Sequence, residues 1–247
     1  MIDSSQLFGH VADAYELGRP SWPAAALDLA QRELSLAPGA SVLDLGAGTG
    51  KLTRLLLERF ETVAAVEPDA EMRALISGGA DVLIGRAEEI PAPDGSFSAV
   101  FCGESFHWFE WERALLEIAR VLQRGGGLVL LSNRPSGGLS SDEWPVGVKE
   151  ALDRIADPIP PEHRYMSFAW RDALVGSAFE ELRCETFPNG ALLDRERLLA
   201  RVSSWSHVAA LPEPERRAFL DEIAAHLTEP SYPATLETHL YWTRLPA

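Results

Sequence analysis

The chain has 247 residues, of which 46% are hydrophobic, and its formal net charge is −15. This length suits one large α/β domain or a domain with an inserted cap, and the charge argues against a nucleic-acid-binding or anionic-membrane surface, which would need a basic patch. There is no bilayer-spanning apolar stretch, no signal-peptide pattern and no metal-binding spacing of Cys102 and Cys184, so we expect a cytoplasmic protein without a metal.

The first 37 residues predict two helices. Apolar side chains between Leu7 and Tyr15 fall on one face of a short helix, which the segment from Gly18 to Pro23 ends. We expect Ser21 to be the N-cap of a second helix, with Pro23 in its first turn, and that helix continues toward Pro38.

The stretch from Val42 to Thr53 predicts a buried strand, a glycine turn and the start of a helix near Thr49 or Lys51. Gly46, Gly48 and Gly50 occupy alternate positions of the turn. Glycine allows positive φ and lets a ligand approach the backbone without meeting a Cβ. This arrangement is typical of a site for part of a nucleotide-like ligand, and the alternative interpretation is a tight turn that binds nothing.

Residues 62–69 predict a second strand that ends in an acid, Glu67. A carboxylate at this end of a strand, beside the glycine turn, can accept hydrogen bonds from the two hydroxyls of a ribose. The alternative is a solvated charge at a strand end. Asp69 is the expected N-cap of a helix over residues 70–76.

The remainder of the chain continues the alternation of strands and helices, which predicts an α/β fold with a doubly wound, mostly parallel sheet. The expected strands lie at 81–85, 97–102, 128–132, 181–187 and 235–245, and the expected helices at 111–122, 142–156, 170–179, 194–205 and 213–227. We expect Gly125, Gly126 and Gly127 to stop the helix that precedes them.

Five segments of the chain carry a resemblance to a known family. The pattern Asp44-x-Gly46-x-Gly48-x-Gly50 departs from the dinucleotide fingerprint, whose third glycine would fall at Lys51. It resembles motif I of the class I S-adenosylmethionine-dependent methyltransferases, and the segments 85–97 and 119–126 are similar to that family's third-strand segment and its turn into the fifth strand. The run 104–109 and the segment 14–23 resemble a narrower subgroup that includes trans-aconitate methyltransferase-like enzymes.

The resemblance implies a seven-stranded Rossmann-like sheet in a single structural domain. Residues 1–37 would form N-terminal helices and a lid, residues 38–135 the cofactor-binding core, and residues 136–247 the rest of the sheet. A helical substrate cap would be inserted at 193–230.

The resemblance also assigns candidate cofactor-binding residues. They are Asp44, Gly46, Ala47, Gly48, Gly50, Glu67, Pro68, Ala87, Glu88, Gly103 and Glu104. Many relatives carry an acid that faces the adenine amino group where this chain has Arg86, so we assign that contact to Glu88, with a solvated role as the alternative.

Candidates for the acceptor side are fewer. His107 is the expected catalytic residue, as a base or a hydrogen-bonding group, and the alternative is a packing role that orders its loop. The expected substrate and lid residues are Tyr15, Arg19, Trp22, Trp108 and Phe109, of which Arg19 can grip an anion. The alternatives are a surface position for Arg19, a helix-packing role for Tyr15, and ordinary core packing for Trp108 and Phe109. The sequence does not select among further residues that could line the pocket: His163, Arg164, Tyr165, Trp170, Trp205, His207, His239 and Tyr241.

The sequence therefore predicts transfer of a methyl group from S-adenosylmethionine to a small-molecule acceptor. Oxygen, nitrogen, carbon and carboxylate acceptors are all open, with a carboxylate or a hydroxyl as the named candidates. The product of the cofactor would be S-adenosylhomocysteine. The alternatives are a non-catalytic sensor or partner subunit that binds either compound, and a nicotinamide-dependent oxidoreductase, which Lys51 disfavours. We expect no nucleic-acid or membrane partner, and a monomer or homodimer.

Overall fold

The computed structural model describes residues 7–135, 144–155, 159–164 and 167–247. In chain order its elements are η2 (Gly9–Val11), α1 (Ala12–Gly18), α2 (Ala24–Glu33), β1 (Ser41–Leu45), α3 (Lys51–Leu57), β2 (Thr62–Val66), α4 (Ala70–Arg73), β3 (Asp81–Leu83), β4 (Phe97–Gly103), η3 (Phe106–Trp108), α5 (Trp111–Val121), β5 (Leu122–Pro135), α6 (Val146–Asp153), η4 (Pro161–His163), α7 (Trp170–Leu174), β6 (Arg183–Pro188), β7 (Ala191–Leu193), α8 (Arg195–Ser203), α9 (Ser206–Ala209), α10 (Glu213–His226), β8 (Tyr232–Ala234) and β9 (Leu236–Arg244).

Seven strands form one sheet in the order β3-β2-β1-β4-β5-β9-β6. The first five of these pair in parallel, and β9 runs antiparallel to both β5 and β6. This confirms the predicted mostly parallel, seven-stranded α/β fold. The chain moves from β1 to β2 on one side and later returns to β4 on the other, so a crevice opens beyond the carboxyl ends of β1 and β4, where open α/β sheets bind ligands.

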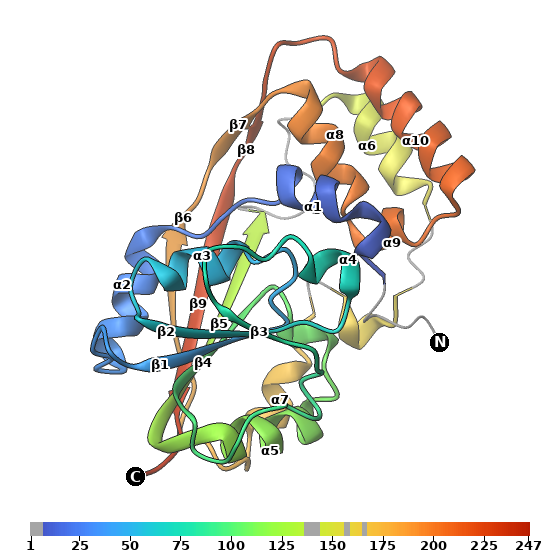
Figure 1. Cartoon of the computed structure of the whole chain (residues 1–247). Coiled ribbons are helices and arrows are strands. Elements are labelled where there is room, and N and C mark those ends of the chain that lie inside the picture. Colours follow the sequence, from blue (N-terminus) through green and yellow to red (C-terminus); the bar gives the residue numbers. More distant parts are fainter. Residues whose placement is uncertain (1–6, 136–143, 156–158, 165–166) are drawn as a thin grey trace.

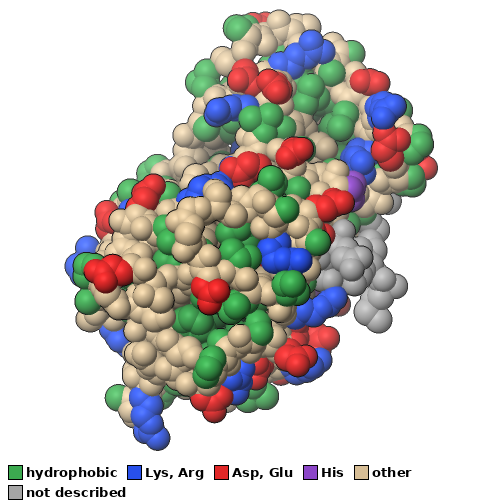
Figure 2. Space-filling view, viewed as in Figure 1, with side chains coloured by type: hydrophobic (Ala, Val, Ile, Leu, Met, Phe, Trp, Pro, Cys, Tyr) green, Lys and Arg blue, Asp and Glu red, His purple; other side chains and the backbone are tan. Residues whose placement is uncertain are grey.

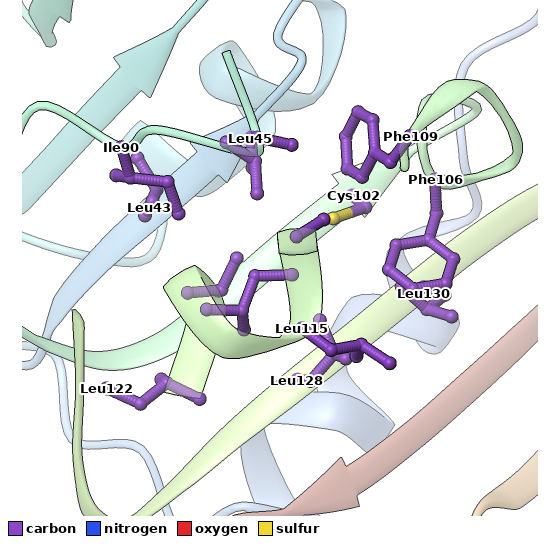
Figure 3. Close-up of a cluster of buried hydrophobic side chains, with 14 of the residues drawn as sticks. Leu43, Leu45, Ile90, Cys102, Phe106, Phe109, Leu115, Leu122, Leu128 and Leu130 are labelled. Carbon is purple, nitrogen blue, oxygen red and sulfur yellow. The ribbon is translucent and has the colours of Figure 1, made fainter. Parts of the chain in front are cut away.

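Helices cover both faces of the sheet because alternate strand residues point to opposite faces. On one face, Leu43 of β1 and Leu128 of β5 pack with Ile118 of α5. Figure 3 shows Leu43, Leu45, Cys102 and Leu130 in this layer together with Leu115 of α5. On the other face, the strand residues that alternate with these pack against α2 and α3. Figure 1 shows both helices on that side of the sheet. The members of this second layer include Leu27, Val42, Leu52, Leu56, Phe101, Val129 and Leu240.

Helices α6, α8, α9 and α10 form a cap with its own hydrophobic cluster, seen at the upper right of Figure 1. Cluster members from these helices include Val148, Leu198, Val208, Phe219 and Ile223. Strands β7 and β8 pair antiparallel beside it. The sequence placed the cap at residues 193–230, and α6 joins it from an earlier part of the chain because Val148 and Ala151 are fully buried.

Three local predictions were wrong. Helix α2 begins at Ala24 with Pro23 in the N-cap position, and the Ser21 carbonyl instead accepts hydrogen bonds from two asparagine side chains of β5 and the β6–β7 turn. The glycines 125–127 do not stop the preceding helix, which ends at Val121, but lie inside β5. Helix α7 ends at Leu174 rather than Phe179, shortly before Gly176, whose φ of +77° is left-handed.

Candidate active site

The glycine turn between β1 and α3 places a stretch of bare backbone at the crevice. Gly46, Gly48 and Gly50 have φ values of +70°, +57° and +81°, a region that favours glycine. A Cβ built at Gly46 would lie 2.6 Å from Cβ of Ser105, whereas one built at Gly48 would meet no atom within 4 Å. The turn is therefore packed at Gly46 and faces open space at Gly48.

Glu67 follows β2 beside this turn, and its carboxylate is held by two backbone donors. The N–H of Gly48 donates to Oε2 over 2.8 Å, and the N–H of Asp69 donates to Oε1 over 2.9 Å. Burial raises the pKa of Glu67, and these two hydrogen bonds oppose the rise. Each carboxylate oxygen can accept a second hydrogen bond, so Glu67 retains the capacity to bind two hydroxyl groups.

A cavity of about 760 Å³ extends from the glycine turn to the loop after β4. It is lined by nearly all the predicted site residues: Gly46, Ala47, Gly48, Glu67, Pro68, Ala87, Glu88, Gly103, Glu104, His107, Tyr15, Arg19, Trp22, Trp108 and Phe109. Segments that are far apart in the sequence thus meet around one space. The structure brings these residues together, and their binding roles remain predictions.

Asp44 and Gly50 are the two predicted site residues that do not line this cavity. Asp44 is buried beneath α3, where Thr53 Oγ1 donates to its Oδ2 over 2.6 Å. Burial raises the pKa of Asp44 to about 7. A Cβ at Gly50 would lie 3.2 Å from the backbone of Ile76, so this glycine allows close packing behind the turn. Both residues support the turn from outside the cavity.

The segment after β3 lines the side of the cavity to which we assigned the adenine. Ala87 is buried there, and Glu88 is half-buried. The Glu88 Oε1 atom accepts a hydrogen bond from the backbone N–H of Glu110, 2.8 Å away. One oxygen of the Glu88 carboxylate thus fixes the loop before α5. Because that oxygen is already occupied, a contact of both carboxylate oxygens with the adenine is less favourable than the sequence suggested.

The loop after β4 supplies the opposite side. His107 and Trp108 belong to η3, and the ring centroids of Trp108 and Phe8 lie 5.8 Å apart in an edge-to-face arrangement. Burial lowers the pKa of His107 to about 3, and the charges of Arg19, Arg134 and His163 act in the same direction. His107 is therefore neutral at physiological pH. A group with this pKa is a weak general base but can still donate or accept one hydrogen bond.

Glu104 connects the two sides of the crevice at the end of β4. Its φ of +58° is unusual for a residue with a side chain, and its Oε1 accepts the backbone N–H of Asn133. Burial raises the pKa of Glu104 to about 7. Such a strained residue at the carboxyl end of a central strand is a common feature of functional sites.

Tyr15 and Arg19, which the sequence predicts to be lid residues, line the cavity from the N-terminal segment. Burial raises the pKa of Tyr15 to about 12, against the opposing charge of Arg19. The Arg19 guanidinium lies over the Tyr15 ring at 5.2 Å and donates two hydrogen bonds to Ser204, one to Oγ over 3.0 Å and one to the carbonyl over 2.7 Å. Arg19 therefore ties the lid to the cap while it lines the cavity.

Among the eight residues that the sequence left unselected, His163 lines the cavity within the described part of the chain. Its Nδ1 contacts the carbonyl of His107 over 2.7 Å. Trp170 and Tyr241 belong to the core beneath the sheet, and Trp205 stacks on Trp144 in the cap. Tyr165 lies outside the described residues.

The sequence did not single out several other lining residues. Thr49, Lys51 and Asp69 adjoin predicted site residues in the chain, so proximity to the motif could have identified them. Phe8, Met72, Ile159, Pro160 and Ser206 also line the cavity. Ile159 and Pro160 come from a segment far from the motifs, and no local pattern marks them.

The described residues show neither a metal-binding cluster nor a membrane-spanning helix. Across the described residues, no group of three or more His, Cys, Asp or Glu side chains is arranged to hold a metal ion. In that same part of the chain, every helix is too short or too polar to span a bilayer. Figure 2 shows acidic and basic side chains interspersed on the face it presents.

Comparisons with known proteins agree with this geometry. A family model described as a methyltransferase domain matches residues 43–130. An uncharacterized methyltransferase-like protein of Schizosaccharomyces pombe is 34% identical over 230 residues, which cover 90% of this chain and 87% of that protein. An uncharacterized methyltransferase of Mycobacterium tuberculosis is 43% identical over 162 residues, and this match spans 64% of the chain and 63% of the relative's length.

Solved structures share the fold. A type II methyltransferase candidate from Anaeromyxobacter dehalogenans aligns with a TM-score of 0.62 at 23% identity and covers 93% of this chain and 99% of that one. A phosphoethanolamine N-methyltransferase of Haemonchus contortus, solved with phosphomonomethylethanolamine and S-adenosylhomocysteine, aligns with a TM-score of 0.60 at 15% identity over 100% of this chain and 61% of that one.

Proposed function

We propose that this protein, which belongs to the class I S-adenosylmethionine-dependent methyltransferases, transfers a methyl group from S-adenosylmethionine to a small-molecule acceptor. The family membership rests on the fission-yeast relative, which matches nearly the whole chain. The observation that carries the proposal is the position of Gly48 and Glu67: a bare backbone turn and a carboxylate meet at one end of a cavity whose other end is lined by aromatic and polar side chains.

The residues present fit the cofactor. The open space at Gly48 leaves room for the amino-acid portion of the cofactor against the backbone of the turn. Glu67 would accept the two ribose hydroxyls through the lone pairs that its backbone donors leave free. Pro68, Ala87 and Glu88 would surround the adenine, and Gly103 and Glu104 would border the methionine portion.

When bound, the cofactor supplies a methyl carbon activated by a positively charged sulfur. The chain must then hold the acceptor in line with that carbon, at roughly 3 Å, and exclude water. Trp108, Phe109 and Trp22 would wall this space, and the neutral His107 would orient the acceptor through a hydrogen bond rather than remove its proton. Arg19 would hold an acceptor carboxylate only through the N–H groups that Ser204 does not engage.

In this proposal the acceptor is a small molecule with a carboxylate or hydroxyl group. Membership of this chain in the subgroup of trans-aconitate methyltransferase-like enzymes stays a prediction. A cytoplasmic protein, monomeric or homodimeric, without a nucleic-acid or membrane partner, is part of the same proposal. A sealed or absent space beside the cofactor would favour a non-catalytic binding protein. The extent of the cavity toward His107 and His163 gives that alternative no support.

Calorimetric titration with S-adenosylmethionine and with S-adenosylhomocysteine tests the proposal without knowledge of the acceptor. We expect both compounds to bind with micromolar dissociation constants. Absence of binding by both would refute the proposed function, and a change in the fluorescence of reduced nicotinamide on mixing would instead support an oxidoreductase.

A further inference from the structure

Helix α1 lies between the glycine turn and the cap, as the dark blue helix beneath α8 in Figure 1 shows. One of its acidic residues, Glu16, faces the start of α3 rather than the cavity. Two other lid residues, Tyr15 and Arg19, line the cavity itself. This short helix therefore contacts the turn, the cavity and the cap at the same time.

Both oxygens of the Glu16 carboxylate are engaged by the turn and its helix. Thr49 Oγ1 donates to Oε2 over 2.6 Å, and Arg54 Nη2 contacts Oε1 over 2.5 Å. Lys51 Nζ lies 3.7 Å from the same Oε1. Arg54 also donates to the Thr49 carbonyl over 3.1 Å, so one network contains the turn backbone, the α3 side chains and the lid carboxylate.

The last residue of α1, Gly18, is packed tightly against the cap. A Cβ at Gly18 would lie 2.1 Å from the backbone nitrogen of Arg201, so α1 and α8 touch through their backbones. Arg19 donates two hydrogen bonds to Ser204, and His10 Nε2 contacts the carbonyl of Ala209 over 3.0 Å. Any displacement of α1 toward or away from the turn must therefore move or release the cap.

We propose that Glu16 is a positioning residue that couples occupancy of the cofactor site to the placement of the cap over the acceptor. This inference rests on the proposed function. Cofactor seated on the turn fixes Thr49 and the start of α3, Glu16 transmits that order to α1, and α1 holds α8 through Gly18 and Arg19. The placement of the cap over the acceptor side then depends on whether the cofactor site is occupied.

A purely structural ion pair would behave differently. Exposed pairs contribute little to stability, and Glu16 is only half-buried, so its loss would change the stability of the protein slightly and leave ligand responses unchanged. Coupling, in contrast, is measured as a change that one site makes in another. A measurement of how cofactor binding affects the cap separates the two roles.

Hydrogen exchange with and without saturating S-adenosylhomocysteine provides that measurement. In the wild type we expect the ligand to slow exchange in the turn, residues 46–52, and also in α8, residues 195–203, by at least about tenfold. In Glu16→Gln the turn keeps its protection while α8 is slowed by less than about twofold. Asp13→Asn, which removes an exposed acid from the same helix, should behave as the wild type.

The outcomes are distinct. Protection of α8 that persists in Glu16→Gln, or that never appears in the wild type although the turn is protected, overturns the coupling. Absence of protection in the turn as well refutes the proposed function itself. Arg54→Gln removes one of the three partners of the same carboxylate, one that does not line the cavity, and gives the same comparison if Glu16→Gln fails to fold.

Discussion

The backbone N–H of Gly48 donates to the Glu67 carboxylate over 2.8 Å, and this contact joins the loops that follow two neighbouring parallel strands. Gly48 provides backbone that a ligand can approach, and Glu67 provides acceptors for hydroxyl groups. Because the same hydrogen bond fixes both, the two halves of the predicted cofactor site are held at a constant separation.

Gly48→Val should block the cofactor site without preventing folding. The new side chain would point into open space, and the left-handed φ of +57° would cost about 1–2 kcal/mol of unfolding free energy. Gly95→Val is a matched control, because Gly95 has a φ of +63° and equally open surroundings but does not line the cavity. Calorimetry should find S-adenosylhomocysteine affinity reduced by more than about 100-fold in the first variant and unchanged in the control. Equal affinities in both would refute the placement of the site.

Glu67→Gln should remove selectivity for the ribose hydroxyls. The amide keeps one acceptor oxygen and sets an NH2 group against a backbone donor, which weakens hydrogen bonds worth about 1.5–3 kcal/mol. We expect the wild type to bind S-adenosylhomocysteine more tightly than its analogue without ribose hydroxyls, and the variant to bind both alike. A variant that retains the wild-type preference would show that Glu67 does not contact the ribose.

Asp44 should make the protein less stable as the pH rises. Burial raises its pKa from 3.8 to about 7, so the folded state binds a proton that the unfolded state releases between these values. The stabilisation is complete below the unfolded pKa and is lost as the pH rises through about 7, with a slope of at most about 1.4 kcal/mol per pH unit. In Asp44→Asn, the free energy of unfolding measured with urea should differ less between pH 5 and pH 8 than it does in the wild type. An identical pH dependence of the unfolding free energy in the two proteins would contradict the raised pKa of Asp44.

His107 should remain neutral throughout the physiological range. Burial lowers its pKa to about 3, with the nearby arginines acting in the same direction. Nuclear magnetic resonance of the imidazole nitrogens, assigned by comparison with His107→Gln, should show no titration of His107 between pH 5 and pH 8. A transition near pH 6.5 would restore His107 as a candidate general base.

Much of the site could be predicted from the sequence because its central part is local. An apolar strand, a turn that needs positive φ and an acid at the next strand end are adjacent in the chain, and parallel pairing of β1 with β2 brings them together. Asp44 shows where this reasoning failed. It shares a strand face with Val42, which packs toward α2 and α3, so its side chain reaches Thr53 instead of the cavity.

The parts that could not be predicted depend on packing between distant segments. Glu88 accepts the N–H of Glu110 because the loops after β3 and β4 meet in space, which neither segment encodes alone. Likewise, α6 joins the cap and Ile159 reaches the cavity through tertiary contacts. Hydrophobic periodicity identifies such helices but does not say which surface each one covers.

A crystal structure with S-adenosylhomocysteine bound tests the central claim most directly. We predict that the amino-acid portion of the ligand lies against the backbone at Gly48, with both ribose hydroxyls within hydrogen-bonding distance of the Glu67 carboxylate. A ligand seated elsewhere on the protein, or a ribose that makes no contact with Glu67, would contradict the account.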